Sequence, residues 1–501
     1  MSVDPSTEAT KKELYEYQKE DLAKVFHRLE NCPANYNLLY QLPTGGGKTV
    51  VFSEITRRYI QEYKKRVLIL THRIELCQQT SRMLDGFQVP TMIIDSKVKA
   101  LPKDHKFDCF VAMVETLNNR LNDKDISFEN IGLVIVDEAH YNSFRKLFKF
   151  FDKCFMLGVT ATPLSSNINL PMNEIYNELI VGYPIKKLVE QGYLSKATTY
   201  SYQVGLGSLK VGINGDYTVK SSEILYSNDL MQQKLLIAYE ERAKGRKTLI
   251  FNNGINTSIQ VYYTFKEAGY PVRHIDSKIS KADRIAILKW FKETPGAILS
   301  SVGILTTGFD EPTIQSIIIN RATKSPTLYY QMIGRGSRVL PNKSTFDVID
   351  LGNNAARFGL WEEELDWQMV FRSPNFYLES LLTDEEIERQ FVYKMPADLL
   401  EKFAKSKDMD FDVYAKYDEI KSKGLRTSTI IDESIEQHAR MITENAADLL
   451  EGFALVRALT PDIMDRIRRY CYCISNSTRN YKEWVLDDYN TRLRKAVTNH
   501  F

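Results

Sequence analysis

Ile131-Gly132-Leu133-Val134-Ile135-Val136-Asp137-Glu138-Ala139-His140 is the stretch that decides the fold of this chain. Five apolar residues and one glycine run directly into two acids and a histidine. An apolar run rich in Val and Ile is typical of a strand that is buried on both faces of a parallel sheet. Two adjacent carboxylates are costly to bury unless a cation lies beside them. The pattern indicates a buried strand whose acids face a metal-bound phosphate; a strand that ends in a solvated turn is the alternative.

A phosphate-binding loop is indicated earlier in the chain, at Pro43-Thr44-Gly45-Gly46-Gly47-Lys48-Thr49. It follows a predicted strand, Leu38–Leu42, and precedes a predicted helix, which is the context such a loop requires. Glycines let backbone N–H groups wrap phosphates, and the helix N-terminus adds a partial positive charge. The residues expected to contact the nucleotide are Thr44, Gly45, Gly46, Gly47, Lys48 and Thr49. Leu42 stands where the general pattern has a glycine, so this is a variant of the loop.

Further strands are predicted at 66–70, 110–114 and 155–159, so the acids and the loop belong to one strand–helix domain. In such a site Lys48 reaches the β- and γ-phosphates, while Thr49 and Asp137 hold Mg²⁺. Glu138 is expected to orient and deprotonate the attacking water. Thr160-Ala161-Thr162 follows the next strand, and the hydroxyls of Thr160 and Thr162 are candidates to sense the nucleotide; a capping role is the alternative.

A helix is predicted from Leu14 to Leu29, and Gln18 lies in its first turns. The amide of Gln18 can read the edge of an adenine while Tyr15 or Tyr17 stacks on the ring. The alternative is a helix N-terminus that simply packs on the domain.

The strand–helix rhythm weakens after about Leu164 and resumes near Met231. A strand is predicted from Thr198 to Val204, and the glycine-rich stretch 205–215 is interpreted as a loop. Strands are then predicted at 247–251, 272–275, 297–301, 316–320 and 346–350. These strands indicate a second lobe of the same kind.

A helix is predicted to start at Thr327 and to extend through Gln331-Met332-Ile333-Gly334-Arg335-Gly336-Ser337-Arg338. Two arginines three residues apart on a helix lie on one face, and a planar guanidinium matches phosphate oxygens. Supplied from the second lobe, Arg335 and Arg338 are expected to act as arginine fingers on the γ-phosphate. A solvated basic helix face is the alternative.

These motifs, taken in order, resemble those of superfamily 2 helicases with a DEAH box. The Q motif and motifs I, II and III are matched by Gln18, Pro43–Thr49, Asp137–His140 and Thr160–Thr162, and motifs IV, V and VI by Asn253, Gly308-Phe309-Asp310 and Gln331–Arg338. A finer resemblance is to the RadD-like bacterial and phage branch, through Thr306–Pro312, Arg321–Ser325, Asp350–Asn353 and Arg357–Gly359. Relatives of that branch often carry a cysteine-rich C-terminal zinc module, which this sequence lacks.

The resemblance implies an α/β fold with two tandem RecA-like parallel-sheet lobes followed by an α-helical C-terminal domain. We expect the first lobe at 1–164, a crossover at 165–228, the second lobe at 229–360 and the helical domain at 361–501. It further implies ATP and Mg²⁺ as cofactors, with Gly308 and Asp310 at the nucleotide. His140 is placed where the family couples the nucleotide to the opposite lobe, through Gln331.

The family also implies a single polynucleotide strand that crosses both lobes. Candidate contacts are polar residues at strand ends, namely Thr71, Arg73, Thr116, Asn253 and Ser301 or its neighbour Ser300. Hydroxyls, amides and arginines position a backbone without reading bases; each of these residues can alternatively be an ordinary cap. The function expected is an ATP-dependent helicase or translocase on single-stranded or branched DNA. An RNA helicase and a nucleic-acid-binding ATPase switch within a larger complex are the alternatives.

Composition constrains the remaining possibilities. The chain has 501 residues, 43% hydrophobic and 26% charged, with a formal net charge of +2, so global charge does not indicate a nucleic-acid binder. Its six cysteines show no C-x-x-C spacing, so zinc is not indicated. Met1–Lys12 lacks the apolar core of a signal peptide, and no apolar run approaches the roughly 18 residues of a membrane helix. We therefore expect a cytoplasmic protein that does not bind membranes.

The last 140 residues are expected to form helices without chemistry of their own, and their protein partners stay open. The spacing of Asp412, Glu419 and Lys421 faintly resembles a metal-dependent nuclease core, although it falls in a predicted helix. Basic and aromatic residues between Arg466 and Lys495 could stack on bases and pair with phosphates. A packed helical face is at least as good an interpretation of the same residues.

Overall fold

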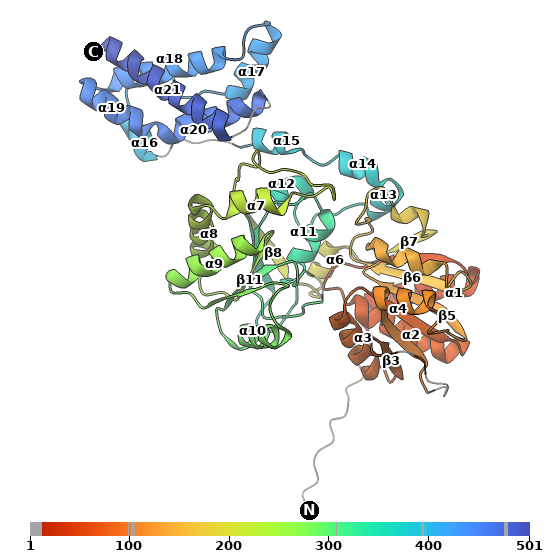
Figure 1. Cartoon of the computed structure of the whole chain (residues 1–501). Coiled ribbons are helices and arrows are strands. Elements are labelled where there is room, and N and C mark those ends of the chain that lie inside the picture. Colours follow the sequence, from red (N-terminus) through yellow and green to blue (C-terminus); the bar gives the residue numbers. More distant parts are fainter. Residues whose placement is uncertain are drawn as a thin grey trace, which may run out of the picture. The chain divides into compact units, whose positions relative to one another are not determined.

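The computed structural model describes residues 13–98, 100–101, 106–306, 308–391, 395, 397–474 and 479–501. Met1–Lys12, whose sequence lacks the apolar core of a signal peptide, lies outside the described residues. The chain divides into two compact units (Figure 1). Unit 1 comprises Met1–Tyr202 with Val211–Leu381, and unit 2 comprises Gln203–Lys210 with Leu382–Phe501.

Unit 1 begins with a seven-stranded parallel sheet in the order β3-β4-β2-β5-β6-β1-β7. Its strands are β1 (Asn37–Gln41), β2 (Arg66–Thr71), β3 (Thr91–Ile94), β4 (Cys109–Met113), β5 (Ile131–Asp137), β6 (Phe155–Thr160) and β7 (Glu178–Val181). Ile131–Asp137 forms the central strand β5, and Leu133–Val136 is completely buried. A strand covered on both faces needs apolar residues at every position, which explains its unbroken run.

The helices of this lobe alternate with its strands. They are α1 (Glu16–Asn31), α2 (Lys48–Tyr63), α3 (Ile74–Gly86), α4 (Val114–Asn122), α5 (Arg145–Phe148) and α6 (Ile185–Glu190). Sequence patterns did not reveal β3 and β7. Both are four-residue strands at the two edges of the sheet, where partial exposure leaves too short an apolar run to recognise.

The second sheet of unit 1 has six parallel strands in the order β10-β11-β9-β12-β13-β8. Its strands are β8 (Lys196–Ser201), β9 (Thr248–Asn252), β10 (Val272–Ile275), β11 (Ile298–Val302), β12 (Ser316–Asn320) and β13 (Thr345–Asp350). The accompanying helices are α7 (Val219–Tyr226), α8 (Asp229–Arg242), α9 (Ile255–Glu267), α10 (Lys281–Glu293), α11 (Pro326–Ile333), α12 (Asn354–Phe358), α13 (Trp367–Arg372) and α14 (Pro374–Glu379). The predicted α/β architecture of two parallel-sheet lobes is confirmed.

The stretch expected to be a crossover contributes to both sheets. β7 completes the first sheet and β8 the second, and both lie between residues 165 and 228. The division between compact units falls after Leu381. The limits of four separate domains stay a prediction.

Unit 2 is helical where it is described, as expected for the C-terminal region. Its helices are α15 (Asp384–Arg389), α16 (Ala397–Lys402), α17 (Val413–Ser422), α18 (Thr429–Asn445), α19 (Leu449–Ala458), α20 (Thr460–Cys473) and α21 (Arg479–His500). Asp412 caps α17 by accepting the N–H groups of Tyr414 and Ala415, and Glu419 pairs with Lys416 on the same helix and with Lys423 just after it. These contacts favour helix capping over a nuclease core. None of the helices in the described ranges has the length and apolar character needed to cross a bilayer.

A buried polar chain holds three helices of unit 2 together. His438 on α18 contacts Asp462 Oδ2 at 2.6 Å through Nε2 and the Tyr489 hydroxyl at 2.8 Å through Nδ1. Arg466 pairs with the same Asp462 at 2.6 Å and is only 3% exposed. Arg466 is thus part of the packed core rather than of a nucleic-acid surface. Burial lowers the pKa of His438 to about 4, although the Asp462 carboxylate opposes the shift.

This depressed pKa predicts that unit 2 is sensitive to acid. Between about pH 6.5 and about pH 4 the unfolded chain binds a proton at His438 that the folded chain does not, so stability falls as the pH falls through this window. At 1.36 kcal/mol per pKa unit, the loss is roughly 3 kcal/mol. Hydrogen exchange of the α18 amides at several pH values in this range measures the loss of stability. His438→Gln, which cannot titrate, should show a shallower slope, and identical slopes for the two proteins would contradict the assignment.

Candidate nucleotide site and nucleic-acid face

The phosphate loop lies between β1 and α2, as predicted. Gly45 and Gly47 adopt φ of +93° and +84°, a region that side chains rarely enter. A Cβ on Gly47 would lie 2.5 Å from Gln18 Nε2, and one on Gly45 would overlap Ser337 Oγ of the second lobe. The glycines are therefore required by both conformation and close packing. Thr49 follows Lys48 in the first turn of α2.

Gln18 fastens α1 to this loop. It is 2% exposed; its Nε2 donates to the Gly46 carbonyl at 3.2 Å, and its Oε1 accepts the Tyr15 N–H at 3.0 Å. The Tyr17 hydroxyl donates to the same carbonyl at 2.7 Å. Tyr193, which the sequence did not single out, packs its ring 4.6 Å from Tyr15 and 4.9 Å from Tyr17. Recognition of adenine by this group stays a prediction.

The two acids are buried at the carboxyl end of β5. Asp137 is 6% exposed and Glu138 is 8% exposed, and the Glu138 N–H donates to Asp137 Oδ1 at 3.0 Å. Burial and the neighbouring Glu138 raise the pKa of Asp137 to about 7 against the attraction of Lys48. For Glu138, burial is outweighed by Lys48, His140 and Arg335, so its pKa is lowered. Lys48 is thus the protein's own cation beside both carboxylates, and burial lowers its pKa in turn.

Glu138 also has an unusual backbone. Its φ of +53° is uncommon for a residue with a side chain and is costly unless the surroundings enforce it. Its Oε2 is buried without a hydrogen bond and lies 3.5 Å from His140 Nδ1. A strained carboxylate with an open acceptor fits a group that receives a proton.

The predicted coupling residues meet across the two lobes. His140 Nδ1 lies 3.0 Å from Thr160 Oγ1, and its Nε2 lies 3.4 Å from Gln331 Nε2 on α11. Thr162 donates its hydroxyl to Thr327 Oγ1 at 3.0 Å, again from the first lobe to α11. One short helix of the second lobe therefore contacts both motifs that follow the acids.

The two arginines do not lie on a helix, and that prediction was wrong. Helix α11 ends at Ile333, before either arginine. Gly334 and Gly336 allow the close packing that stops it, because a Cβ on the first would meet Thr44 and one on the second would meet Phe346. The arginines are carried by an irregular segment, 334–338, which we call the arginine loop.

Each arginine nevertheless points to the interface between the lobes. Arg338 Nη1 donates to the Gly45 carbonyl of the phosphate loop at 2.9 Å, while its Nε pairs with Asp310 Oδ1 at 2.9 Å. Arg335 donates to the carbonyls of Thr306 and Phe309 at 2.6 Å each. Burial lowers the pKa of Arg335 to about 10, and Glu138 partly offsets this.

The neighbourhood of Asp310 is only partly described. Gly308 has φ of +74° and packs against Leu76 of the first lobe, where a Cβ would lie 2.9 Å from Leu76 Cδ2. Thr307, part of the same matched stretch, lies outside the described residues. Contact of Gly308 and Asp310 with a nucleotide stays a prediction.

Lys343 and Ser195 hold the arginine loop, and sequence reasoning missed both. Lys343 Nζ donates to the carbonyls of Gly336 at 2.6 Å, Arg338 at 2.7 Å and Pro312 at 3.1 Å. The Ser195 hydroxyl donates to the Arg338 carbonyl at 2.8 Å. No local motif marks either residue, because their partners are backbone atoms of a distant loop.

The candidate polynucleotide contacts divide into two groups. Thr71 and Ser301 are completely buried, and their hydroxyls donate to the carbonyls of Arg73 at 3.1 Å and Ile250 at 3.0 Å. The neighbouring Ser300 is equally buried. These residues offer no surface to a phosphate, so their assignment lacks structural support.

The other three candidates are partly exposed. Thr116 lies in the first turn of α4. Arg73 donates to the second-lobe carbonyls of Ile304 at 3.2 Å and Gly303 at 3.4 Å, and Asn253 donates to Ser222 Oγ at 2.7 Å. Contacts of these three with a strand stay predictions.

His72 is a further residue that the sequence did not single out. Both of its ring nitrogens are buried without hydrogen-bond partners. Its ring lies 4.4 Å from Tyr141, which lies 4.4 Å from His140 on its other side. Burial lowers the pKa of His72 to about 4, so a neutral imidazole stands beside the acids.

Two family models match the two lobes. "Type III restriction enzyme, res subunit" matches residues 11–165, and "Helicase conserved C-terminal domain" matches residues 228–339. The chain belongs to helicase superfamily 2. Members of this superfamily are ATP-hydrolysing enzymes, in agreement with a phosphate loop and an acid pair at the interface between two lobes.

Relatives of this superfamily 2 member span phages and fungi. A 51.5 kDa protein of a Lactococcus phage is 27% identical over 337 residues, covering 66% of this chain and 69% of the phage protein. A putative ATP-dependent helicase of Saccharomyces cerevisiae is 28% identical over 336 residues, covering 62% of this chain but only 47% of the yeast protein. The chain thus spans about half the length of this yeast relative.

Solved structures share the fold. A fragment of a putative HsdR subunit of a type I restriction enzyme from Vibrio vulnificus has a TM-score of 0.52 and 20% identity, covering 74% of this chain and 68% of the fragment. The RadD-like branch is compatible with these matches and stays a prediction.

Because Lys343 holds the arginine loop, we expect its replacement to affect ATP turnover, unlike replacement of Lys247, another buried lysine of the second lobe. Lys343 and Lys247 are 7% and 6% exposed, and Lys247 donates to the Lys292 carbonyl at 2.6 Å, away from the nucleotide site. Replacing either by Met leaves carbonyls without donors, which costs about 1–3 kcal/mol of stability. Only Lys343→Met should also lower kcat for ATP hydrolysis, by about tenfold, or ~1.4 kcal/mol in the barrier. Equal kcat values for the two variants would contradict a positioning role of Lys343.

Proposed function

We propose that this chain is an ATP-dependent helicase or translocase that acts on DNA. The observation that carries the proposal is the meeting of the phosphate loop, the acid pair and the arginine loop at one interface. Arg338 reaches the Gly45 carbonyl from the opposite lobe at 2.9 Å. A site completed from two lobes hydrolyses ATP only when the lobes are aligned, which is the requirement for coupling hydrolysis to movement.

The chemistry follows from groups of this chain. Thr49 and Asp137 would hold Mg²⁺, since a hydroxyl and a carboxylate oxygen are the ligands this hard cation prefers. The bound cation would neutralise charge on the phosphate oxygens. Lys48 is beside the acids and within the loop, so it binds the phosphates. Glu138, with its open Oε2, accepts the proton of the attacking water.

The second lobe supplies the transition-state contacts. Arg335 and Arg338 are the candidate fingers, and a guanidinium in this position contributes on the order of 10³-fold or more. His140, Thr160 and Thr162 report the state of the nucleotide to Gln331 and Thr327 of α11. Because α11 belongs to the second lobe, nucleotide-dependent contacts at these atoms shift the balance between lobe arrangements.

DNA is the preferred substrate because of the relatives. They include an ATP-dependent DNA helicase of phage T4, which is an enzyme of DNA by name, and type I restriction enzyme endonuclease subunits of Escherichia coli. An RNA helicase and a nucleotide-dependent switch subunit remain the alternatives. The helical unit 2 is the proposed surface for protein partners, and a cytoplasmic location is proposed with it.

Glu138→Gln separates binding from turnover. The amide is similar in shape but cannot accept a proton from water, so we expect retained ATP binding and a kcat lowered by about 10²-fold or more. Titration with a fluorescent nucleotide measures binding, and the rate of phosphate release measures kcat. Glu54→Gln, on the first lobe and paired with Arg57, is the control and should hydrolyse ATP normally. Normal turnover by Glu138→Gln would remove Glu138 as the base.

A panel of polynucleotides decides the substrate. We expect single-stranded or branched DNA to stimulate ATP hydrolysis more than RNA of the same sequence, with strand separation in a fluorescence assay. Greater stimulation by RNA would establish the RNA alternative. Nucleotide-dependent binding without strand separation would establish the switch. No stimulation by any polynucleotide would refute the proposed function.

A further inference from the structure

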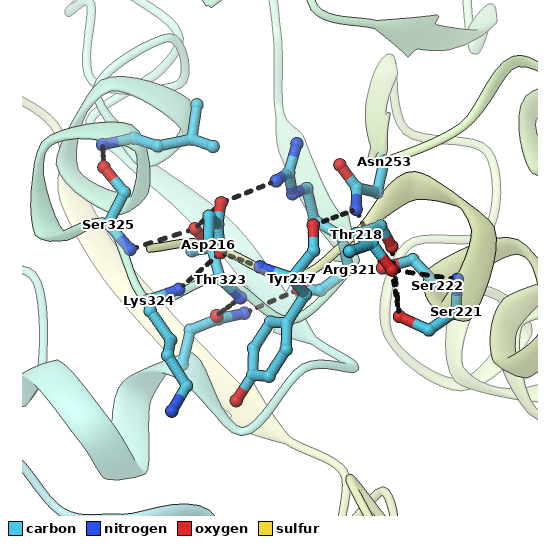
Figure 2. Close-up of polar contacts among 12 residues, drawn as sticks. Asp216, Tyr217, Thr218, Ser221, Ser222, Asn253, Arg321, Thr323, Lys324 and Ser325 are labelled. Atoms are coloured by element: carbon cyan, nitrogen blue, oxygen red, sulfur yellow. Dashed lines mark hydrogen bonds and ion pairs between the residues drawn. The ribbon is translucent and has the colours of Figure 1, made fainter. Parts of the chain in front are cut away.

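The carboxylate of Asp216 joins two segments of the second lobe that are far apart in sequence. Its Oδ1 accepts the N–H groups of Lys324 and Tyr217, both at 2.8 Å (Figure 2). Its Oδ2 accepts the Thr323 hydroxyl at 2.7 Å and the Arg321 guanidinium at 3.2 Å. A carboxylate offers about four lone-pair sites, so its hydrogen-bonding capacity is filled here. No local sequence pattern indicates these contacts: Asp216 follows the stretch 205–215, which is interpreted from its glycines only as a loop.

Asp216 belongs to a short hairpin, 211–217, which is fixed at the carboxyl edge of the second sheet. Val211 and Tyr217 form an antiparallel bridge. Tyr217 is 3% exposed; its hydroxyl accepts from Arg357 Nη2 at 3.0 Å, and its carbonyl accepts from Asn253 Nδ2 at 3.3 Å. Arg357 lies on α12, which follows β13, and Asn253 lies just after β9, so the hairpin contacts the segments after two strands besides the turn after β12. The hairpin is therefore packed against the carboxyl edge of the second sheet.

The turn that Asp216 holds leads directly into α11. Thr323 Oγ1 accepts the Ser325 N–H at 3.1 Å, and Ser325 Oγ caps α11 by accepting the Leu328 N–H at 3.2 Å. In the first turn of α11, Thr327 meets Thr162 of the first lobe, and one turn further Gln331 meets His140. α11 has only eight residues, and backbone hydrogen bonds between successive turns tie its first turn to its last. A displacement of its first turn therefore displaces both contacts to the motifs that follow the acids.

We propose that Asp216 is a positioning residue for ATP turnover. It fixes the turn before α11 and so aligns Thr327 and Gln331 with the first lobe. The inference rests on the proposed function, since it assigns Asp216 a part in the same hydrolysis. Asp216 lies outside the nucleotide site and acts through α11. The phosphate loop and the acids belong to the first lobe, so we expect a change at Asp216 to affect ATP binding less than turnover.

Asp216→Asn tests this, with Asp347→Asn as the matched control. In Asp216→Asn an amide NH₂ group replaces one carboxylate oxygen. This NH₂ group cannot accept the hydrogen bonds that the oxygen accepted, and it faces their donors. Asp347 is 6% exposed and pairs with Arg246 in the same lobe, before β9. Both variants should lose thermal stability. Only Asp216→Asn should lower kcat, by about tenfold, with KM for ATP within about twofold, as expected for a contact that matters in the transition state.

Thr323 supplies a second test that spares the buried charge. Thr323→Val removes the hydroxyl that bonds Asp216 and should lower kcat, whereas Thr323→Ser keeps the hydroxyl and should restore it. Two results would overturn the inference: an unchanged kcat in both Asp216→Asn and Thr323→Val, or a loss of kcat in Asp347→Asn as large as in Asp216→Asn. In either case, hydrolysis of ATP by the wild-type chain would still uphold the proposed function. A wild-type chain that hydrolyses no ATP with any polynucleotide would overturn both.

Discussion

The burial of two adjacent carboxylates at the end of β5 is the constraint on which the rest of the site depends. Asp137 and Glu138 are both less than a tenth exposed. Isolated charges in such surroundings are costly, so cations must be brought to them. Lys48 supplies one from the phosphate loop and Arg335 another from the second lobe, and both act on the pKa of Glu138. The acid pair thereby connects the two lobes even before a nucleotide is considered.

Glycines make this convergence possible. Gly45, Gly47 and Gly334 each stand where a Cβ would run into a side chain from another part of the chain. Two of these encounters, Gly45 with Ser337 and Gly334 with Thr44, are between the phosphate loop and the arginine loop. The backbones of the lobes therefore approach each other directly. A carbonyl of one can then accept from an arginine of the other, as Gly45 does from Arg338.

Features with a local signature could be predicted from the sequence, and those defined by distant partners could not. The central strands, the glycine loop and the acids are contiguous patterns whose residue types follow from burial or phosphate chemistry. The end of α11 depends on packing of Gly334 against Thr44, which no local pattern reveals. Lys343, Tyr193 and Asp216 were missed for the same reason. The burial of Thr71 and Ser301 could not be predicted either, because a hydroxyl at a strand end looks the same in sequence whether it faces solvent or a carbonyl.

Arg335 shows why such a site responds to its ligand. Its guanidinium is held by the carbonyls of Thr306 and Phe309 in the segment that follows β11. A phosphate on the first-lobe loop would compete with these neutral acceptors, and a charged acceptor binds a guanidinium more strongly than a neutral one. Movement of Arg335 toward the phosphate would release the segment that also presents Asp310 to Arg338. Arg335 would thus link the nucleotide to the backbone between β11 and β12, and departure of the phosphate that hydrolysis releases would reverse the exchange.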